Sequence, residues 1–490
     1  ILQAVKKFLF LLILALGFLL RAQETLSGNY LFLLDQGRDM MAVKSIVYDH
    51  HLTLIGPHTS LGGVFQGPFW YYLLAVATFL TGGNPWGGVF LSLLISMGTI
   101  VVAFLFARKL FGLRVAFITA FLLAICPEAA AAATYAWNPH PMWLLLTIYT
   151  FSFYLLVQGK KKYHFVVWPT VALMFSFQTA LGTFIFLSSI IYLILSARKQ
   201  LKTKEFLFGL MSFLILLSPQ ILFDFRHDFL MSKGVIAMFS GSRQGTGFLS
   251  HVVTTFTDHF YNFHVNFNSA FNGLIFSGVA FYLLLFSILF GRLTKFLSDK
   301  EYKFVILSAK LVLTVFSFSL LYQSPLRAWF LTGFEVMFIF PLGIILAKFW
   351  ERSFGKVLLT ILLLITLWVI IPRIYNLYRS PDYGGIAKVK GKLDAIDYIY
   401  KDAKGGEFNM MVFAPAVYTD PYDYLVWWRS ENVYRYAPGK EKEGTFYLLI
   451  EPDSSKPWTY KGWLETVVKS GEIIFTTELP SGLIVQKRSH

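Results

Sequence analysis

The chain has 490 residues, of which 56% are hydrophobic and only 14% are charged. Ordinary globular proteins carry about a quarter charged residues, so this composition excludes a soluble fold for most of the chain. The formal net charge of +15 does not indicate nucleic-acid binding, because lysine and arginine gather in short clusters between apolar blocks, as they do in loops beside a membrane. Membrane lipids are therefore expected partners and nucleic acid is not.

The first apolar block, residues 8–20, follows Lys6 and Lys7 and has the basic start and apolar middle of a secretory signal peptide. Arg21 comes directly after the block, however, and no small-residue cleavage site follows it. Many further apolar blocks lie downstream. We therefore expect a retained first helix.

Apolar blocks continue to residue 372, after which the composition becomes ordinary. A helix needs about 20 residues to cross the hydrocarbon layer, with shorter apolar cores possible between polar ends. This pattern predicts a polytopic α-helical membrane domain over residues 1–372 and an extracytoplasmic α/β domain over 373–490. The spans, about eleven by the same criterion, are predicted at 8–20, 88–107, 115–126, 142–157, 165–180, 182–197, 206–223, 271–290, 303–322, 329–347 and 355–372.

Residues 67–80 form a short apolar block whose role is decided by loop charge. If this block does not span, five clusters of Lys and Arg share the side of Lys6 and Lys7, as the positive-inside rule requires. We therefore predict an interfacial or re-entrant helix here, a cytoplasmic N-terminus and a first outer loop over residues 21–87. The absence of a transit segment favours a prokaryotic plasma membrane.

The first outer loop begins with an amphipathic pattern over residues 30–48 that places Asp35, Arg38 and Asp39 within one helical turn. Residues three and four apart share a helix face, so two carboxylates and a guanidinium lie together beside the membrane. The alternative is an interfacial helix whose charges merely face water. The following loop adds His58 and Gln66, which favours the floor of a site.

A second outer segment contains Trp137-Asn138-Pro139-His140-Pro141. Its two prolines can simply end one helix and start the next. Alternatively, Trp137 stacks on a sugar and Asn138 forms hydrogen bonds with it. The sequence leaves both interpretations open.

Two outer arginines, Arg226 and Arg327, lie at helix edges and suit a phosphate or a lipid headgroup. Histidines are frequent between them, but no His-Glu-x-x-His spacing occurs, so we expect no metal site there. Cys126, the one cysteine of the chain, is expected to be a packing residue.

The sequence of the C-terminal domain indicates a helix after Gly384, a further helix over 461–469 and strands at 408–414, 446–450, 472–477 and 482–487. It contains no nucleotide-binding glycine fingerprint. An aromatic loop is predicted at 418–436, where the rings either pack the domain against its neighbours or bind an acceptor sugar. We favour packing.

The order of DQGR, GPHTSLGGVFQGPFWYYLLA, ARKLFG and YAWNPHP resembles the family 39 glycosyltransferases of the GT-C fold. These include bacterial aminoarabinose transferases of lipid A and protein mannosyltransferases. The resemblance covers about the first 230 residues; the later helices match only in type. It implies a polyprenyl-phosphate sugar donor and an acidic general base in the first outer loop.

By position, the resemblance makes Asp35 the candidate base. Gln36 stands where the family has Glu, and Asp39 supplies a second carboxylate from the same helix face. The remaining assignments are donor-phosphate binding by Arg38, Arg226 and Arg327, and substrate binding by His58, Gln66, Trp137 and Asn138. Because Gln66 replaces a basic residue of the family and Asn138 an acidic one, no divalent metal or other cofactor is expected.

These residues predict a membrane glycosyltransferase that moves a sugar from a polyprenyl phosphate to a hydroxyl acceptor outside the cell, with inversion. The acceptor is a lipid, a glycan or a protein. The alternative is a transporter or flippase for lipid-linked sugars, which should carry ionisable residues at mid-membrane depth. Glu335 is the main such residue, so the sequence favours the enzyme. A noncatalytic glycan-binding protein would leave the carboxylate pair unexplained.

Overall fold

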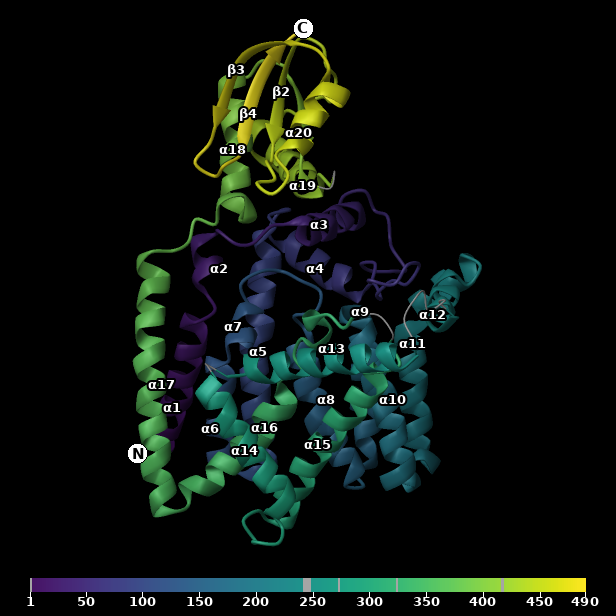
Figure 1. The fold of residues 1–490 in the computed structure, drawn as a ribbon, viewed down its shortest axis with the longest axis vertical. Helices are drawn as coiled ribbons and strands as arrows, with labels where there is room; N and C mark the ends of the chain where they lie inside the picture. The colour runs from purple at the N-terminus through teal and green to yellow at the C-terminus, as the bar shows by residue number, and fades with distance from the viewer. Residues whose placement is uncertain (1, 241–247, 272–273, 323–324, 416–417) are drawn as a thin grey trace.

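The structure, a computed structural model, describes residues 2–240, 248–271, 274–322, 325–415 and 418–490. It consists of a bundle of helices with a small α/β domain standing on one end (Figure 1). The helices that overlap the predicted spans are α1 (Leu2–Leu19), α5 (Trp86–Phe111), α6 (Leu113–Ile125), α8 (Met142–Val157), α9 (His164–Phe177), α10 (Thr179–Ser196), α11 (Lys204–Arg226), α14 (Leu274–Phe290), α15 (Asp299–Ser319), α16 (Val336–Trp350) and α17 (Ser353–Arg379).

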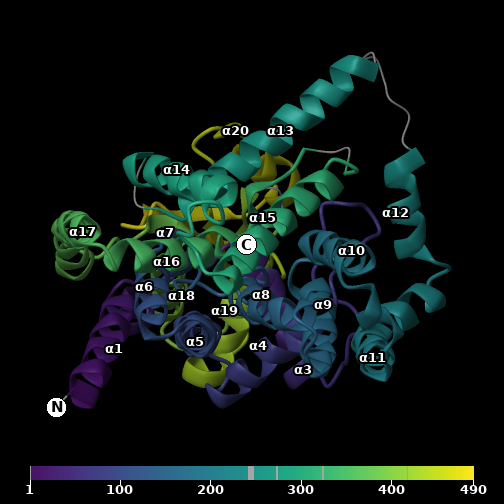
Figure 2. The ribbon, with the colours of Figure 1, turned by 90° about the horizontal axis from the view of Figure 1, so that it is seen from below.

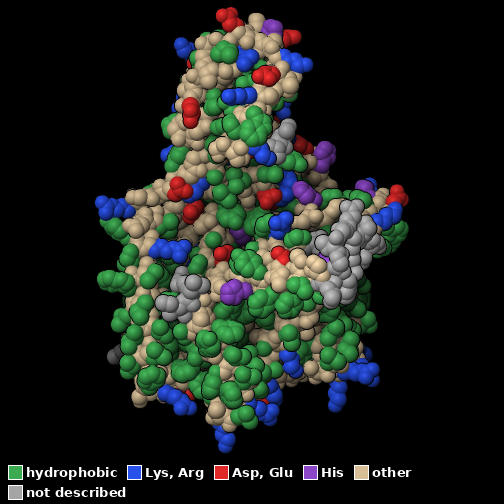
Figure 3. All heavy atoms as spheres, viewed as in Figure 1, with side chains coloured by type: hydrophobic (Ala, Val, Ile, Leu, Met, Phe, Trp, Pro, Cys, Tyr) green, Lys and Arg blue, Asp and Glu red, His purple; other side chains and the backbone are tan. Residues whose placement is uncertain are grey.

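Length and composition identify the membrane-crossing part of this bundle. Within the described residues, α5, α10, α11, α15 and α17 are long and apolar enough to cross a membrane. Shorter apolar helices accompany them, among them α6, α8, α14 and α16. On the face shown in Figure 3, a broad hydrophobic band covers the bundle, and Lys and Arg side chains gather at the end away from the α/β domain. This distribution fits a membrane protein, as predicted.

The core of the bundle lies around α8, which packs against α5, α9 and α16 (Figure 2). Large rings fill this core. Trp143, Tyr149, Phe151 and Trp168 are all fully buried. Such rings bury a large apolar area each, which fixes the helices that carry the loops at the upper end.

The first helix is anchored to the bundle by Arg21. Its guanidinium is buried and donates to the carbonyl oxygens of Leu123 and Ala124, at 2.8 and 2.6 Å, and to Ser96 Oγ at 2.9 Å. These bonds satisfy carbonyls at the end of α6 that have no partner within their own helix. The segment predicted as a retained helix is therefore an integral part of the fold.

Two predicted helix boundaries were wrong. The span predicted at 329–347 begins only at Val336, because a short helical turn, η3 (Ala328–Leu331), precedes it and Gly333 adopts φ +84°. The helix predicted over 30–48 is α3 (Leu34–Val47), since residues 30–32 are extended and pair with the C-terminal domain.

The block predicted to be interfacial forms α4 (Phe69–Leu80). Its 12 residues are only one fewer than the 13 of α6, so its position rather than its length distinguishes it from the helices of the predicted spans. It lies under α3 at the end of the bundle that carries the α/β domain, whereas the N-terminus lies in the opposite half (Figure 1). The compartment on each side stays a prediction.

Further helices complete this upper end and the loops. The short ones are α2 (Gln23–Ser27), α7 (Pro127–Ala131) and α12 (Leu230–Ser240), with the single turns η1 (Lys161–Tyr163) and η2 (Arg198–Lys202) between longer helices, and the long one is α13 (Phe248–Ser269). In Figure 1, α13 lies across the bundle rather than along it.

The α/β domain follows α17, which continues past the predicted boundary at residue 373 to Arg379. Its sheet has the order β1-β2-β4-β3, with β1 parallel to β2 and the other pairs antiparallel. The strands β1 (Asn409–Phe413), β2 (Thr445–Ile450), β3 (Glu472–Glu478) and β4 (Ile484–Ser489) confirm the predicted ones. The turn η4 (Gly385–Ala387) and α18 (Val389–Ala403) form the first predicted helix, and α20 (Trp458–Trp463) with η7 (Leu464–Val468) forms the second.

The aromatic segment predicted as a loop is instead a helix, α19 (Asp420–Arg429), followed by η6 (Ser430–Tyr434). Pro421 in the first turn and the acidic residues Asp420 and Asp423 favour a helix start. Tyr422 and Tyr424 are fully buried, so these two rings pack rather than face an open site. The helix lies directly on α3 (Figure 1).

Candidate active site

The site is built on the first turns of α3. The Gln36 side chain accepts a hydrogen bond from the backbone N–H of Leu33, at 3.0 Å, and donates to the carbonyl oxygen of Ala136, at 3.2 Å. An ionised Glu could accept the first bond but could not donate the second. The residue that departs from the family pattern therefore ties the start of α3 to the loop that carries Trp137.

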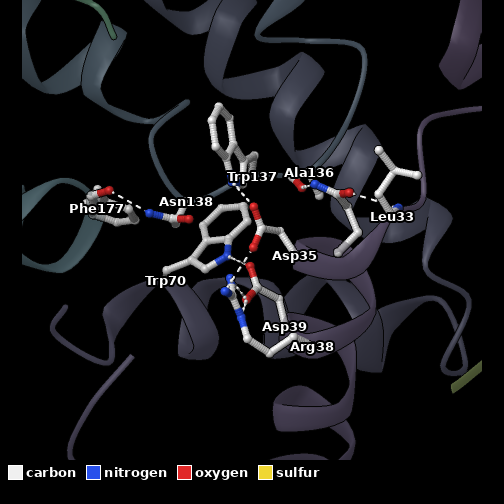
Figure 4. A network of polar contacts seen from close by, with 10 residues as sticks. Leu33, Asp35, Arg38, Asp39, Trp70, Ala136, Trp137, Asn138 and Phe177 are labelled. Carbon is white, nitrogen blue, oxygen red and sulfur yellow. Dashed lines mark hydrogen bonds and ion pairs between the residues drawn. The ribbon is translucent and has the colours of Figure 1, made fainter. Parts of the chain in front are cut away.

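Arg38 joins the two carboxylates of this helix (Figure 4). Its Nη1 lies 2.9 Å from Asp35 Oδ1, and its Nη2 lies 2.7 Å from Asp39 Oδ1. Its Nε also donates to Asp39 Oδ1 at 3.0 Å. The expected cluster on one helix face is present, and its cation is held between the carboxylates.

Asp39 is the inner carboxylate of the pair, with a side chain that is 1% exposed. The Trp70 indole Nε1 donates to its Oδ2 at 2.7 Å. Burial raises the pKa of Asp39 to about 6, although Arg38 and Trp70 both act to lower it. All its oxygen atoms are engaged and no substrate hydroxyl can approach it.

Asp35 is the outer carboxylate, with a side chain that is 41% exposed. The Trp137 indole Nε1 donates to its Oδ2 at 3.1 Å, and Arg38 holds its Oδ1. These two donors fix the orientation of the carboxylate while one side of it stays open. Of the two candidate bases, Asp35 is the one that an external molecule can reach.

Buried polar side chains next to Trp137 in the sequence fix the conformation of its loop. Asn138 is buried and donates to the carbonyl oxygen of Phe177 at 2.9 Å (Figure 4). His140 is also buried, its Nδ1 bonds to the carbonyl oxygen of Tyr135 at 3.0 Å, and burial lowers the pKa of its imidazole to about 3. Asn138 thus fixes the loop, and its predicted contact with substrate stays a prediction.

An exposed arginine lies on the open side of Trp137. The rings of Trp137 and Trp329 are 6.4 Å apart, and the guanidinium of Arg327 lies 5.9 Å from the Trp329 ring centroid. Arg327 and Trp329 are both exposed to solvent. The structure therefore links Arg327 to Asp35 through two aromatic rings. Arg226, exposed at the end of α11, lies outside the network in Figure 4.

The loop over residues 56–67 carries the other two candidates. Backbone bonds close it, with Gly56 N–H donating to the Gln66 carbonyl and Gln66 N–H donating to the Pro57 carbonyl, each at 2.8 Å. His58 is exposed, whereas Gln66 is buried and its Oε1 has no partner among the described residues. Neither side chain is part of the network in Figure 4, so their substrate roles also stay predictions.

Sequence reasoning missed the roles of Trp70 and Trp329. Trp70 lies in the block 67–80, to which the sequence assigned only an interfacial helix, yet its buried N–H holds Asp39. A buried indole N–H usually finds a hydrogen-bond partner, and this rule was the available signal. Trp329 was placed inside a predicted span, so its exposure beside Trp137 could not be anticipated.

The carboxylate pair does not fit a divalent cation. Arg38 already occupies the position between Asp35 and Asp39, and a second cation there would be repelled by the guanidinium. Asn138, in the motif YAWNPHP, donates its side-chain amide to a backbone carbonyl. Across the described residues, no group of three or more His, Cys, Asp or Glu side chains is arranged to hold a metal.

An apolar helix bundle, an acidic helix along one end and an α/β domain above it define the GT-C class of membrane glycosyltransferase folds. The model of the family described as dolichyl-phosphate-mannose-protein mannosyltransferase matches residues 66–223, from the loop before α4 into α11. The chain thus resembles the aminoarabinose transferases and protein mannosyltransferases, as the motifs indicated. No curated protein sequence matches it significantly.

Two solved proteins share the fold over nearly the whole chain. ArnT from Cupriavidus metallidurans bound to undecaprenyl phosphate is 14% identical with a TM-score of 0.61, and the match covers 98% of this chain and 97% of that one. The archaeal oligosaccharyltransferase AglB from Archaeoglobus fulgidus is 12% identical with a TM-score of 0.52, covering 100% of this chain and 74% of that one. At these identities the comparisons establish the fold.

Proposed function

We propose that this protein is a membrane glycosyltransferase that moves a sugar from a polyprenyl-phosphate donor to a hydroxyl acceptor. The observation that carries the proposal is Asp35, an open carboxylate held by Arg38 and Trp137 at the membrane edge. Two proteins of the same fold have structures with lipid phosphates, undecaprenyl phosphate for ArnT and a dolichol phosphate for AglB. These ligands support a polyprenyl-phosphate donor here.

The chemistry needs one base and one site for a leaving phosphate. Asp35 accepts the proton of the acceptor hydroxyl as that oxygen bonds to the anomeric carbon. The bond between the anomeric carbon and the phosphate oxygen breaks, and polyprenyl phosphate leaves with the electron pair. A single displacement of this kind inverts the anomeric configuration. We assign the phosphate charge to Arg327, which is exposed and separated from Asp35 by the rings of Trp329 and Trp137.

Arg38 serves a different purpose in this scheme. Asp39 engages two nitrogen atoms of its guanidinium, which leaves Nη1 for Asp35. The guanidinium is thereby fixed and aligns the base, while Asp39 balances its charge. Asp39 and Trp70 therefore act through Arg38 rather than on the substrate.

The second candidate is a flippase for lipid-linked sugars. It would use the same outer cations and rings but would not need an aligned carboxylate. A transporter should also present ionisable groups along its path through the membrane, whereas Glu335, the residue that the sequence placed inside a span, lies at the start of α16 and outside the helix itself. The open carboxylate of Asp35 favours the enzyme.

The test is to reconstitute the purified protein in vesicles with a panel of polyprenyl-phosphate sugars and a membrane extract as acceptor. Release of polyprenyl phosphate and transbilayer movement of the intact donor are measured in the same samples, with Asp35→Ala as the control. Wild-type release that Asp35→Ala abolishes supports the transferase. Movement of a donor that is never cleaved, equal in both proteins, replaces the transferase with the flippase.

A further inference from the structure

The α/β domain reaches the candidate catalytic helix through α19. Gly37 of α3 faces Pro421 of α19 so closely that a Cβ on Gly37 would lie 2.6 Å from the Pro421 Cα. Real Cβ atoms essentially never approach backbone at that distance. The two helix backbones are therefore in direct contact, and only glycine permits it.

This contact lies on the back of the catalytic face. Residues two apart on a helix do not face each other, so Gly37 points away from Asp35. The side of α3 that presents the carboxylates is turned toward Trp137 and Trp70, and the opposite side rests on α19. A shift of α19 toward α3 would therefore push α3 toward its catalytic partners.

A buried polar cluster fixes α19 within its own domain. Lys392 of α18 is 1% exposed, and its Nζ lies 3.0 Å from Glu451 Oε2 and 3.1 Å from the Tyr422 hydroxyl. The Tyr422 hydroxyl donates to the same Glu451 oxygen. Because Tyr422 follows Pro421, this cluster sets the position of the residue that touches Gly37. Removing one member of such a cluster leaves the others buried and unpaired.

Further contacts link the two domains on either side of Gly37. The Tyr424 hydroxyl donates to the Gly83 carbonyl at 2.7 Å, and the Tyr48 and Trp427 rings pack with centroids 4.7 Å apart. Before α3, the Phe32 N–H donates to the Ala387 carbonyl at 3.0 Å, and the Val389 N–H donates to the Tyr30 carbonyl at 2.9 Å. The α/β domain therefore holds α3 at its start, its back and its end.

We propose that the α/β domain positions the catalytic helix, with Gly37 and Tyr422 as positioning residues for the transfer reaction. The proposal rests on the function proposed above, because it assigns these residues to alignment of Asp35. A displacement of about 1 Å at a reacting group can reduce a rate by about a hundredfold, so a methyl group at position 37 is sufficient to disturb catalysis.

The first test compares Gly37→Ala with Gly98→Ala, a glycine inside α5 around which a Cβ meets nothing within 4 Å. Both changes add the same methyl group to a helix and raise helix propensity by about 1 kcal/mol. We expect Gly37→Ala to lower kcat by about a hundredfold with the donor KM nearly unchanged, and Gly98→Ala to behave as wild type. A folded Gly37→Ala protein with wild-type kcat would overturn the proposal.

The second test covers a Gly37→Ala protein that does not fold. Tyr422→Phe keeps the ring and the contact between α19 and α3 but removes the hydroxyl that bonds to both Lys392 and Glu451. We expect Tyr422→Phe to lower kcat by about tenfold, which is the scale of one lost hydrogen bond. Tyr398→Phe, whose hydroxyl is outside this cluster, is the control and should keep the wild-type rate. Equal rates for the two variants would contradict the role of the cluster.

A third readout separates this proposal from the proposed function. The one native cysteine, Cys126, is buried, so a cysteine introduced as Asp35→Cys reports its own exposure through its rate of maleimide labelling. We expect Gly37→Ala to change that rate by about threefold or more and Gly98→Ala to leave it unchanged, since helix displacement alters access to position 35. If no donor is ever cleaved, the proposed function fails, while an unchanged labelling rate would refute the positioning itself.

Discussion

Replacing Asp35 by Asn is the sharpest test of the candidate base. The amide has the shape of the carboxylate and can keep one of its two contacts, with Arg38 or with Trp137. It cannot accept a proton. General-base assistance is worth about a hundred- to ten-thousandfold, so the variant should lose about 2.7 to 5.4 kcal/mol of transition-state stabilisation. Because Asp35 is 41% exposed, the lost contact should cost little stability.

The assay is release of polyprenyl phosphate by purified protein, with melting temperature measured on the same samples. We expect Asp35→Asn to lower kcat by at least about a hundredfold with little change in donor KM, since the base acts on the acceptor. Asp39→Asn is the matched control, and we expect a decrease of about tenfold through Arg38. An Asp35→Asn protein within tenfold of wild type would refute the assignment. Loss confined to Asp39→Asn would make Asp39 the base.

Three further predictions concern charge and metal. Burial raises the pKa of Asp39 from 3.8 to about 6, so between these pH values the folded protein keeps a proton on Asp39 that the unfolded protein has released. The proton on Asp39 contributes about 3 kcal/mol to the free energy of unfolding at low pH, and this contribution is lost as pH rises through 6. The melting temperature of Asp39→Asn should therefore improve relative to wild type between pH 4 and pH 7; a constant difference would contradict this. Incubation with EDTA should leave activity unchanged, because Arg38 occupies the position between the carboxylates that a cation would need. If EDTA abolishes activity and Mg²⁺ or Mn²⁺ restores it, the protein needs a divalent cation. Glu335 is buried and its Oε2 has no partner among the described residues. Because a buried carboxylate without a partner costs stability, Glu335→Gln should keep or raise the melting temperature. A marked decrease would indicate that the ionised form is required.

The sequence predicted those features that depend on local pattern. The apolar blocks identified the membrane helices, and helical spacing placed Asp35, Arg38 and Asp39 on one face. The order of motifs indicated the GT-C fold, and the four strands lie where the sequence predicted them. Apart from the order of motifs, each of these signals is contained within a short stretch of the chain.

Features that depend on contacts between distant segments could not be predicted. Asp35 and Asp39 look equivalent in the sequence, and only Trp70 and the surrounding packing make Asp39 the inner one. The segment around Tyr422 was predicted as a loop, because its helix is stabilised by packing on α3 rather than by strong propensity. In the sequence, Gln36 is only a missing carboxylate, because its hydrogen bond to the Ala136 carbonyl oxygen joins segments that are far apart in the chain.

The contacts between α3 and the α/β domain also order the biosynthesis of the protein. The Tyr424 hydroxyl and its acceptor at Gly83 are 341 residues apart in the chain, and Asn29, whose side-chain amide donates to the Tyr383 carbonyl, is separated from it by 354 residues. Domains fold as the ribosome releases them, from the N-terminus onward, so α3 reaches the membrane surface long before the residues that hold it exist. The polypeptide is then inserted but its carboxylates are not yet aligned. If the proposed function holds, the site is completed only when the last hundred or so residues have folded onto it, and an unfinished chain lacks an aligned base.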